Sequence, residues 1–147
     1  MRIMQIAAAA ALTLAAVPAS AQIITGKCTP NDVARRWQAV PLTFDTGSTK
    51  IKPEDAKRLD EQASLAKANY IQQICLRGQA DRQGDAKSNE RLALARANMV
   101  ADELVRRGVD RKTIVIEAVG EAGGGASIFA SAEKSRAERR VDLRFTR

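Results

Sequence analysis

The chain has 147 residues, 24 lysines and arginines, 17 acidic residues and no histidine, for a formal charge of +7. Its length suits one modest domain with a hydrophobic core. Two lone cysteines without histidine offer no usual metal-ligand set, so we expect no metal site and no cofactor. We see no pairing of a nucleophile with a base, and we therefore expect a protein that is not an enzyme.

The first 21 residues are typical of an export signal. Arg2 precedes an apolar run over residues 3–17, and Ala19-Ser20-Ala21 fits the cleavage pattern of small residues. We therefore expect residues 1–21 to be a signal peptide and Gln22 to begin the mature protein. A membrane anchor is the alternative, but the run is shorter than the roughly 20 residues that span a bilayer.

If the protein is exported, the compartment limits the partners that its positive charge can attract. Loss of Arg2 with the signal leaves a charge of +6, and we expect a periplasmic protein that is associated with the outer membrane or the cell wall. Nucleic acid is not an expected partner there. Anionic wall polymer, phosphorylated glycolipid and acidic envelope proteins are available, and the charge does not choose among them.

Residues 22–39 form an N-terminal segment that is too short to be a domain and contains Cys28 and Trp37. Cys28 and Cys75 favour one disulfide in an oxidising compartment, although free thiols or a bridge between chains remain open. Val40-Pro41-Leu42-Thr43-Phe44 then reads as a first strand, and residues 45–49 as a turn.

Two amphipathic helices follow, each with one apolar stripe. Pro53 opens the first, and Ser88 or Asn89 is expected to cap the second, which ends before Gly108. The stripes comprise Ala56, Leu59, Ala63, Ala66 and Tyr70 in the first helix and Ala93, Ala97, Val100 and Leu104 in the second.

Strands are expected over residues 71–77, 113–119 and 139–145, with a polar loop over 78–87 and a long loop over 120–137. This order predicts an α+β two-layer sandwich, with both helices on one face of the sheet and the other face open. Cys75 would lie on the open face. We hypothesise that the N-terminal segment crosses that face and brings Cys28 to Cys75.

The loop after the second strand and the helix that follows it carry an acid and a base. Asp81 lies within the run Gly78-Gln79-Ala80-Asp81-Arg82-Gln83-Gly84, and Arg96 lies inside the second helix. Such a pair suits a ligand with both an ammonium and a carboxylate group, since arginine meets a carboxylate with two hydrogen bonds. A structural salt bridge that binds nothing is the alternative.

The same residues resemble the OmpA-like domain family, which includes the C-terminal domains of OmpA, Pal and MotB. The resemblance runs over residues 40–145 and rests on Gly78-x-x-Asp81-x-x-Gly84, Asn89, Leu92, Arg96-Ala97, Gly108-Val109 and Arg139-Arg140-Val141. It implies one domain over residues 40–147, a β-α-β-α-β-β fold with a mixed sheet, and non-covalent binding of peptidoglycan through the diaminopimelate of its stem peptide.

The resemblance also assigns roles to single residues. Asp81 would take the ligand ammonium and Arg96 its carboxylate. Asn89, Arg139 and the turn at Asp45 and Thr46 would line the same pocket.

Four positions depart from the family pattern. Gln79 and Ala80 stand where histidine and threonine are usual, Glu138 replaces an asparagine, and Gly47 has no side chain. Gln79, Ala80 and Glu138 favour an alternative function, an interaction scaffold with a decayed pocket that serves another envelope protein.

Overall fold

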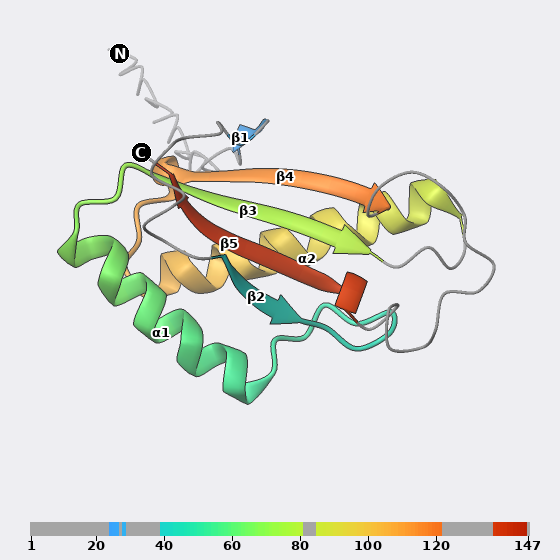
Figure 1. Cartoon of the computed structure of the whole chain (residues 1–147), viewed down its shortest axis with the longest axis horizontal. Coiled ribbons are helices and arrows are strands. Elements are labelled where there is room, and N and C mark those ends of the chain that lie inside the picture. Colours follow the sequence, from blue (N-terminus) through green and yellow to red (C-terminus); the bar gives the residue numbers. More distant parts are fainter. Residues whose placement is uncertain (1–23, 27, 29–38, 81–84, 122–136, 147) are drawn as a thin grey trace, which may run out of the picture.

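Five strands form one mixed sheet in a computed structural model that describes residues 24–26, 28, 39–80, 85–121 and 137–146. The strand order is β1-β4-β3-β5-β2, with β3 parallel to β4 and antiparallel to β5 (Figure 1). The bounds are Ile24–Thr25 for β1, Val40–Thr43 for β2, Gln73–Ala80 for β3, Ile114–Glu121 for β4 and Arg140–Thr146 for β5. The expected signal peptide and Trp37 lie outside the described residues.

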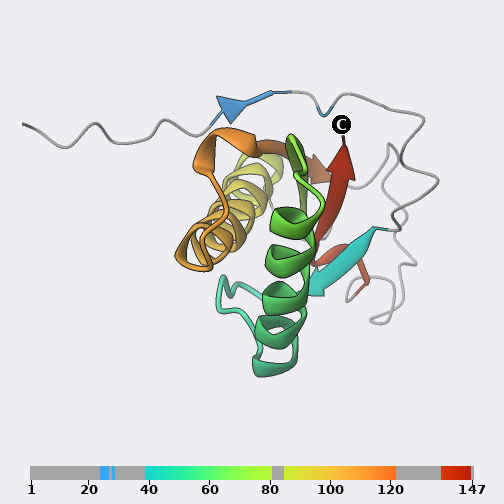
Figure 2. The ribbon, with the colours of Figure 1, turned by 90° about the vertical axis from the view of Figure 1, so that its left-hand side faces the viewer.

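Helices α1 (Pro53–Ala68) and α2 (Ala86–Arg106) both cover the same face of this sheet (Figure 2). The predicted stripe of α2 is fully buried, and Leu59, Ala63 and Ala66 of α1 are buried as well. Tyr70 lies beyond α1 and is 88% exposed, so it does not belong to the stripe. The α+β two-layer sandwich with helices on one face is confirmed.

The region around the predicted loop differs from the expectation. β3 continues to Ala80, because Gly78 pairs with Ala118 of β4 and with Val141 of β5. The cap of α2 is neither Ser88 nor Asn89. Asp85 precedes the helix, and its carboxylate accepts a hydrogen bond of 2.9 Å from the backbone N–H of Ser88.

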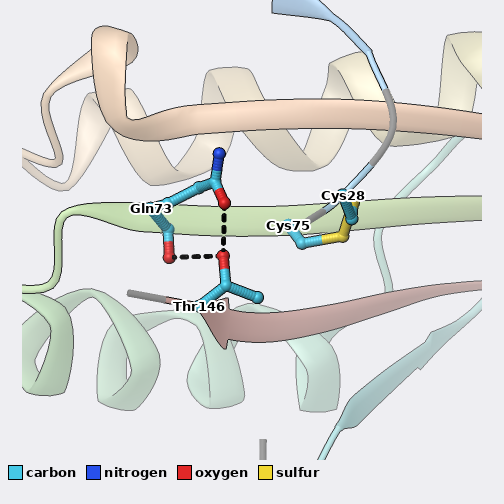
Figure 3. Close-up of a disulfide and its surroundings, with 4 residues drawn as sticks. All are labelled: Cys28, Gln73, Cys75 and Thr146. Carbon is cyan, nitrogen blue, oxygen red and sulfur yellow. Dashed lines mark hydrogen bonds between the residues drawn. A yellow bond between two sulfur atoms is a disulfide. The ribbon is translucent and has the colours of Figure 1, made fainter. Parts of the chain in front are cut away.

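The N-terminal segment contributes an edge strand that the sequence did not indicate. β1 runs parallel to β4, and the Gly26 N–H extends the ladder with a 3.1 Å bond to the carbonyl of Ile116. Cys28 then forms a disulfide with Cys75 of β3, with their Cα atoms 5.7 Å apart (Figure 3). The predicted Cys28–Cys75 disulfide is therefore confirmed, whereas residues 27 and 29–38 of this segment lie outside the described residues.

The sheet face opposite the helices is less open than expected. Cys75, Gln79, Val115 and Asp142 lie on this face and are all less than 8% exposed. Gln79 donates to the Asp142 carboxylate at 3.2 Å, which satisfies two buried polar groups at once. We refer to this side of the sheet as the far face.

Candidate functional site

Arg96 is the centre of the candidate site, and its side chain is completely buried. The guanidinium donates to three backbone carbonyls, those of Ser48 at 2.9 Å, Asp45 at 3.0 Å and Gln79 at 3.4 Å. It also lies over the ring of Phe44, 5.3 Å from the centroid, where a cation–π contact adds to these bonds. Arg96 therefore joins α2, the end of β3 and the loop after β2.

Gly78 brings α2 close enough for Arg96 to reach that loop. A Cβ atom at residue 78 would lie 2.3 Å from the carbonyl oxygen of Ala93 and 3.3 Å from the Cβ of Ala97. The helix thus rests directly on the backbone of β3, where only glycine fits. Ala93 lies one helical turn before Arg96, so this contact sets the depth of the guanidinium.

The start of α2 is fixed independently by Asp85. The hydrogen bond from the Ser88 backbone N–H is the main cause that lowers the pKa of the Asp85 carboxyl, with the Ser88 side chain next. A carboxylate at this end also interacts favourably with the helix dipole.

The loop after β2 forms a turn, and Arg96 donates hydrogen bonds to two backbone carbonyls of this turn. Ser48 N–H donates to the Asp45 carbonyl at 3.1 Å, and Gly47 has a φ of 65°, a conformation that glycine adopts without strain. Lys52 lies 3.4 Å from the Asp45 carboxylate, whose side chain is 79% exposed. Asp45 and Thr46 consequently present their side chains to solvent while the loop backbone is anchored.

The other predicted site residues lie on elements around the same end of the sheet. Asn89 is buried on α2, seven residues before Arg96 and hence on the same helix face. Arg139 is partly buried just before β5 and donates to the Phe44 carbonyl at 3.4 Å. Arg140 points to the far face and binds the Asp142 carboxylate at 3.0 Å. Asp81 lies outside the described residues.

Two of the four positions that depart from the family pattern now have an explanation. Gln79 turns its side chain to the far face toward Asp142, whereas its carbonyl accepts from Arg96. Ala80 is fully buried at the end of β3. The Gln79 side chain is therefore turned away from Arg96, and Ala80 has no polar group to offer a ligand there.

Sequence reasoning missed three groups that define the site: the Phe44 ring and the carbonyls of Ser48 and Gln79. A backbone carbonyl leaves no trace in the sequence, because every residue has one. The Phe44 ring could have been suspected from its place directly before the turn.

The C-terminal ends of β3 and β4, the start of α2 and the loop after β2 gather at one end of the molecule (Figure 1). This end combines a buried cation, bound to three backbone carbonyls, with an exposed carboxylate and hydroxyl at the rim. Within the described residues, no helix combines the length and the apolar composition that spanning a bilayer requires.

Comparison with known proteins agrees with this architecture. The model of the OmpA family matches residues 43–140. The probable lipoprotein YiaD of Escherichia coli is 33% identical over 102 residues, which cover 69% of this chain and 46% of that protein. Outer membrane protein A of Bordetella avium is 33% identical over 100 residues, which cover 68% of this chain and 51% of the relative. The chain thus spans about half the length of these two relatives.

Two solved structures share the fold at lower sequence identity. The peptidoglycan-associated lipoprotein of Burkholderia pseudomallei has a TM-score of 0.62 at 24% identity, covering 72% of this chain and 89% of that one. The C-terminal domain of MotB from Helicobacter pylori has a TM-score of 0.63 at 24% identity, covering 74% and 84%. The matched family model and the curated relatives establish that this chain belongs to the OmpA family.

Proposed function

We propose that this chain is an exported, non-catalytic module that binds peptidoglycan non-covalently through the diaminopimelate residue of the stem peptide. The observation that carries the proposal is the buried guanidinium of Arg96, which is fixed at the end of β3 by the loop that carries Asp45. One structural relative is named as a peptidoglycan-associated protein, which supports the same ligand. We place the protein in the periplasm, at the wall or the outer membrane.

The chemistry of the ligand explains the residues. The free end of diaminopimelate carries an ammonium and a carboxylate, so its pocket needs an anion and a cation close together. Arg96 would take the carboxylate with a rigid fork of N–H groups, which requires the pocket to open because the side chain is completely buried. Asp81 follows Ala80, the last residue of β3, directly in the sequence and would take the ammonium. Asn89, Arg139, Asp45 and Thr46 would line the pocket.

Retention by isolated sacculi tests this assignment, with Asp81→Asn and Arg96→Lys as the informative variants. Asp81→Asn makes the protein more basic, so non-specific attraction to the anionic wall would rise while specific binding falls. The matched controls are Glu61→Gln, a similar charge change at an exposed residue of α1, and Arg91→Lys, an exposed arginine of α2. We expect both pocket variants to lose retention and both controls to keep it.

Soluble muropeptides sharpen the same test. A muropeptide with a free diaminopimelate carboxylate should compete with sacculi, whereas the amidated form should compete at least about tenfold less well, because a neutral amide loses the charged bond to Arg96. Equal retention of wild type and Asp81→Asn at physiological salt would show that the pocket is misassigned.

A second function is favoured by Gln79 and Ala80, which offer no side chain to a ligand beside Arg96. In this alternative the domain is a scaffold that binds another envelope protein. A titration with muropeptide followed by NMR separates the two. Shifts of the Asp45 and Ser48 amides indicate wall binding, and their absence at millimolar ligand favours the scaffold.

A further inference from the structure

Three potential metal ligands meet on the far face. The Sγ atoms of Cys28 and Cys75 and a carboxylate oxygen of Glu117 all lie within 4.8 Å of one another. Within residues 24–26, 28, 39–80, 85–121 and 137–146, this is the one group of three such ligands that the fold assembles. The three residues come from the N-terminal segment, β3 and β4.

Strand register explains the convergence. Cys75 pairs with Val115, and Arg77 pairs with Glu117, so Glu117 lies diagonally across from Cys75 on the same face of the parallel pair. Cys28 follows the short strand β1, which the Gly26 N–H holds against β4. Figure 3 shows Cys28 beside Cys75 on β3, with the two sulfur atoms joined. The carboxylate therefore lies beside the disulfide because of the sheet, independently of the pocket around Arg96.

We propose that reduction of this disulfide creates a site for a soft divalent cation such as Zn²⁺, bound by Cys28, Cys75 and Glu117. A dithiol reductant supplies two electrons and two protons. The S–S bond breaks, both cysteines become thiols, and the dithiol becomes a disulfide. The cation then displaces the two thiol protons, and water completes a tetrahedral set.

The geometry and the charges suit that ion. Zinc lies about 2.3 Å from thiolate sulfur and about 2.0–2.2 Å from carboxylate oxygen, so ligand atoms within 4.8 Å of one another can close around it with small movements. Three anionic ligands exceed the charge of a divalent cation by one. Arg77, opposite Glu117, and Arg144, opposite Cys75, place positive charge on the same face.

The cation would replace the disulfide as the link between the N-terminal segment and the sheet. β1 has two residues, Ile24 and Thr25, so few ladder bonds hold it and a second attachment would stabilise its position. Either the disulfide or the metal provides one. The site goes beyond wall binding and does not depend on it.

Metal titration of the full mature protein tests the proposal. The chain is reduced with a phosphine, exchanged into reductant-free buffer without oxygen, and titrated with Zn²⁺ against a chromophoric chelator. We expect one zinc per reduced chain and none per oxidised chain. Glu117→Gln should bind at least about tenfold more weakly, a loss typical of a removed metal ligand or its support. Glu54→Gln, at an exposed residue of α1, is the matched control and should bind as wild type.

Two further measurements test the site even if reduction of the disulfide loosens the fold. Co²⁺ should give the intense absorption of tetrahedral thiolate coordination in wild type and lose it in Cys28→Ser. Hydrogen exchange at the Gly26 amide should be slow in the zinc-bound reduced protein and fast in its metal-free form. Equal zinc affinity of wild type and Glu117→Gln, two chains per zinc, or an unprotected Gly26 amide with zinc bound would each overturn the site.

Discussion

Replacement of Gly78 by alanine should separate α2 from the sheet at the point that fixes Arg96. The added methyl group would lie 2.3 Å from the carbonyl oxygen of Ala93 and 3.0 Å from its carbonyl carbon. Both are backbone atoms, so no rotation of a side chain relieves the clash. The helix or the strand must move by about 0.7 Å to restore even the closest tolerated contact.

The cost can be bounded from this geometry. Overpacking of a core costs about 1–3 kcal/mol, and the rigid backbone contact favours the upper part of this range. Gly78 is not among the glycines with positive φ, so alanine gains about 0.4–1 kcal/mol from the smaller entropy of its unfolded chain. The net expectation is a loss of about 2 kcal/mol in the free energy of unfolding.

Guanidinium chloride unfolding, followed by circular dichroism, measures this loss for Gly78→Ala. The matched control is Gly26→Ala, whose new Cβ would meet the Val115 Cγ1 atom at 3.9 Å, an ordinary contact. The control should change stability by less than about 0.5 kcal/mol, as is usual away from the core. A loss below about 1 kcal/mol for Gly78→Ala would refute the argument that direct backbone contact sets the position of Arg96.

Three further predictions concern the helix pair and the disulfide. Arg107→Ala should lower the free energy of unfolding by about 1–2 kcal/mol in chemical denaturation, because Arg107 binds the Asp60 carboxylate of α1 at 2.6 Å and the Glu103 carbonyl of α2 at 3.0 Å. Arg107→Lys should recover part of this loss, and an unchanged stability of Arg107→Ala would show that Arg107 does not stabilise the contact between the two helices. The hydrogen bond from Arg106 is the main cause that lowers the pKa of Glu103, and the bond from Arg107 is the next. The ionised Glu103 carboxylate therefore stabilises the folded protein fully above the ordinary carboxyl pKa, and this stabilisation is lost as pH falls through the lowered value. Glu103→Gln should flatten the acid limb of the curve of stability against pH, and an unchanged limb would exclude this contribution. Joint replacement of Cys28 and Cys75 by serine should lower the free energy of unfolding in chemical denaturation by about 4 kcal/mol, the chain-entropy value for a bridge with a sequence separation of 47. A loss below about 1 kcal/mol would show that other contacts hold the N-terminal segment.

The elements that could be predicted are those in which one local signal dominates. The α2 stripe at Ala93, Ala97, Val100 and Leu104 repeats every three to four residues, and each of these residues is fully buried. The boundary at residues 78–80 was wrong because glycine signals a turn locally, whereas Gly78 is held in β3 by partners on both sides. The two-residue strand β1 carries too little periodicity to be recognised before β4 is in place.

The candidate site divides in the same way. Arg96, Asn89 and Arg139 were predicted from their positions in a motif, and the fold places all three around one end of the sheet. The groups that hold Arg96 in place are backbone carbonyls and one aromatic ring, and no spacing of residues in the sequence predicts them. The role of these residues toward a wall peptide remains a prediction.

By itself the sequence determined the two-layer architecture, the buried face of α2, most of the buried face of α1, and the family, because hydrophobic period and motif spacing are properties of the chain. Only the tertiary structure decided that Gly78 is a contact point rather than a turn, that Arg96 is fully buried beneath the Asp45 loop, and that Glu117 stands beside the disulfide. The physical reason is that these features depend on strand register and on the distance between helix and sheet. Both are set by residues far apart in the sequence and exist only once the layers have packed.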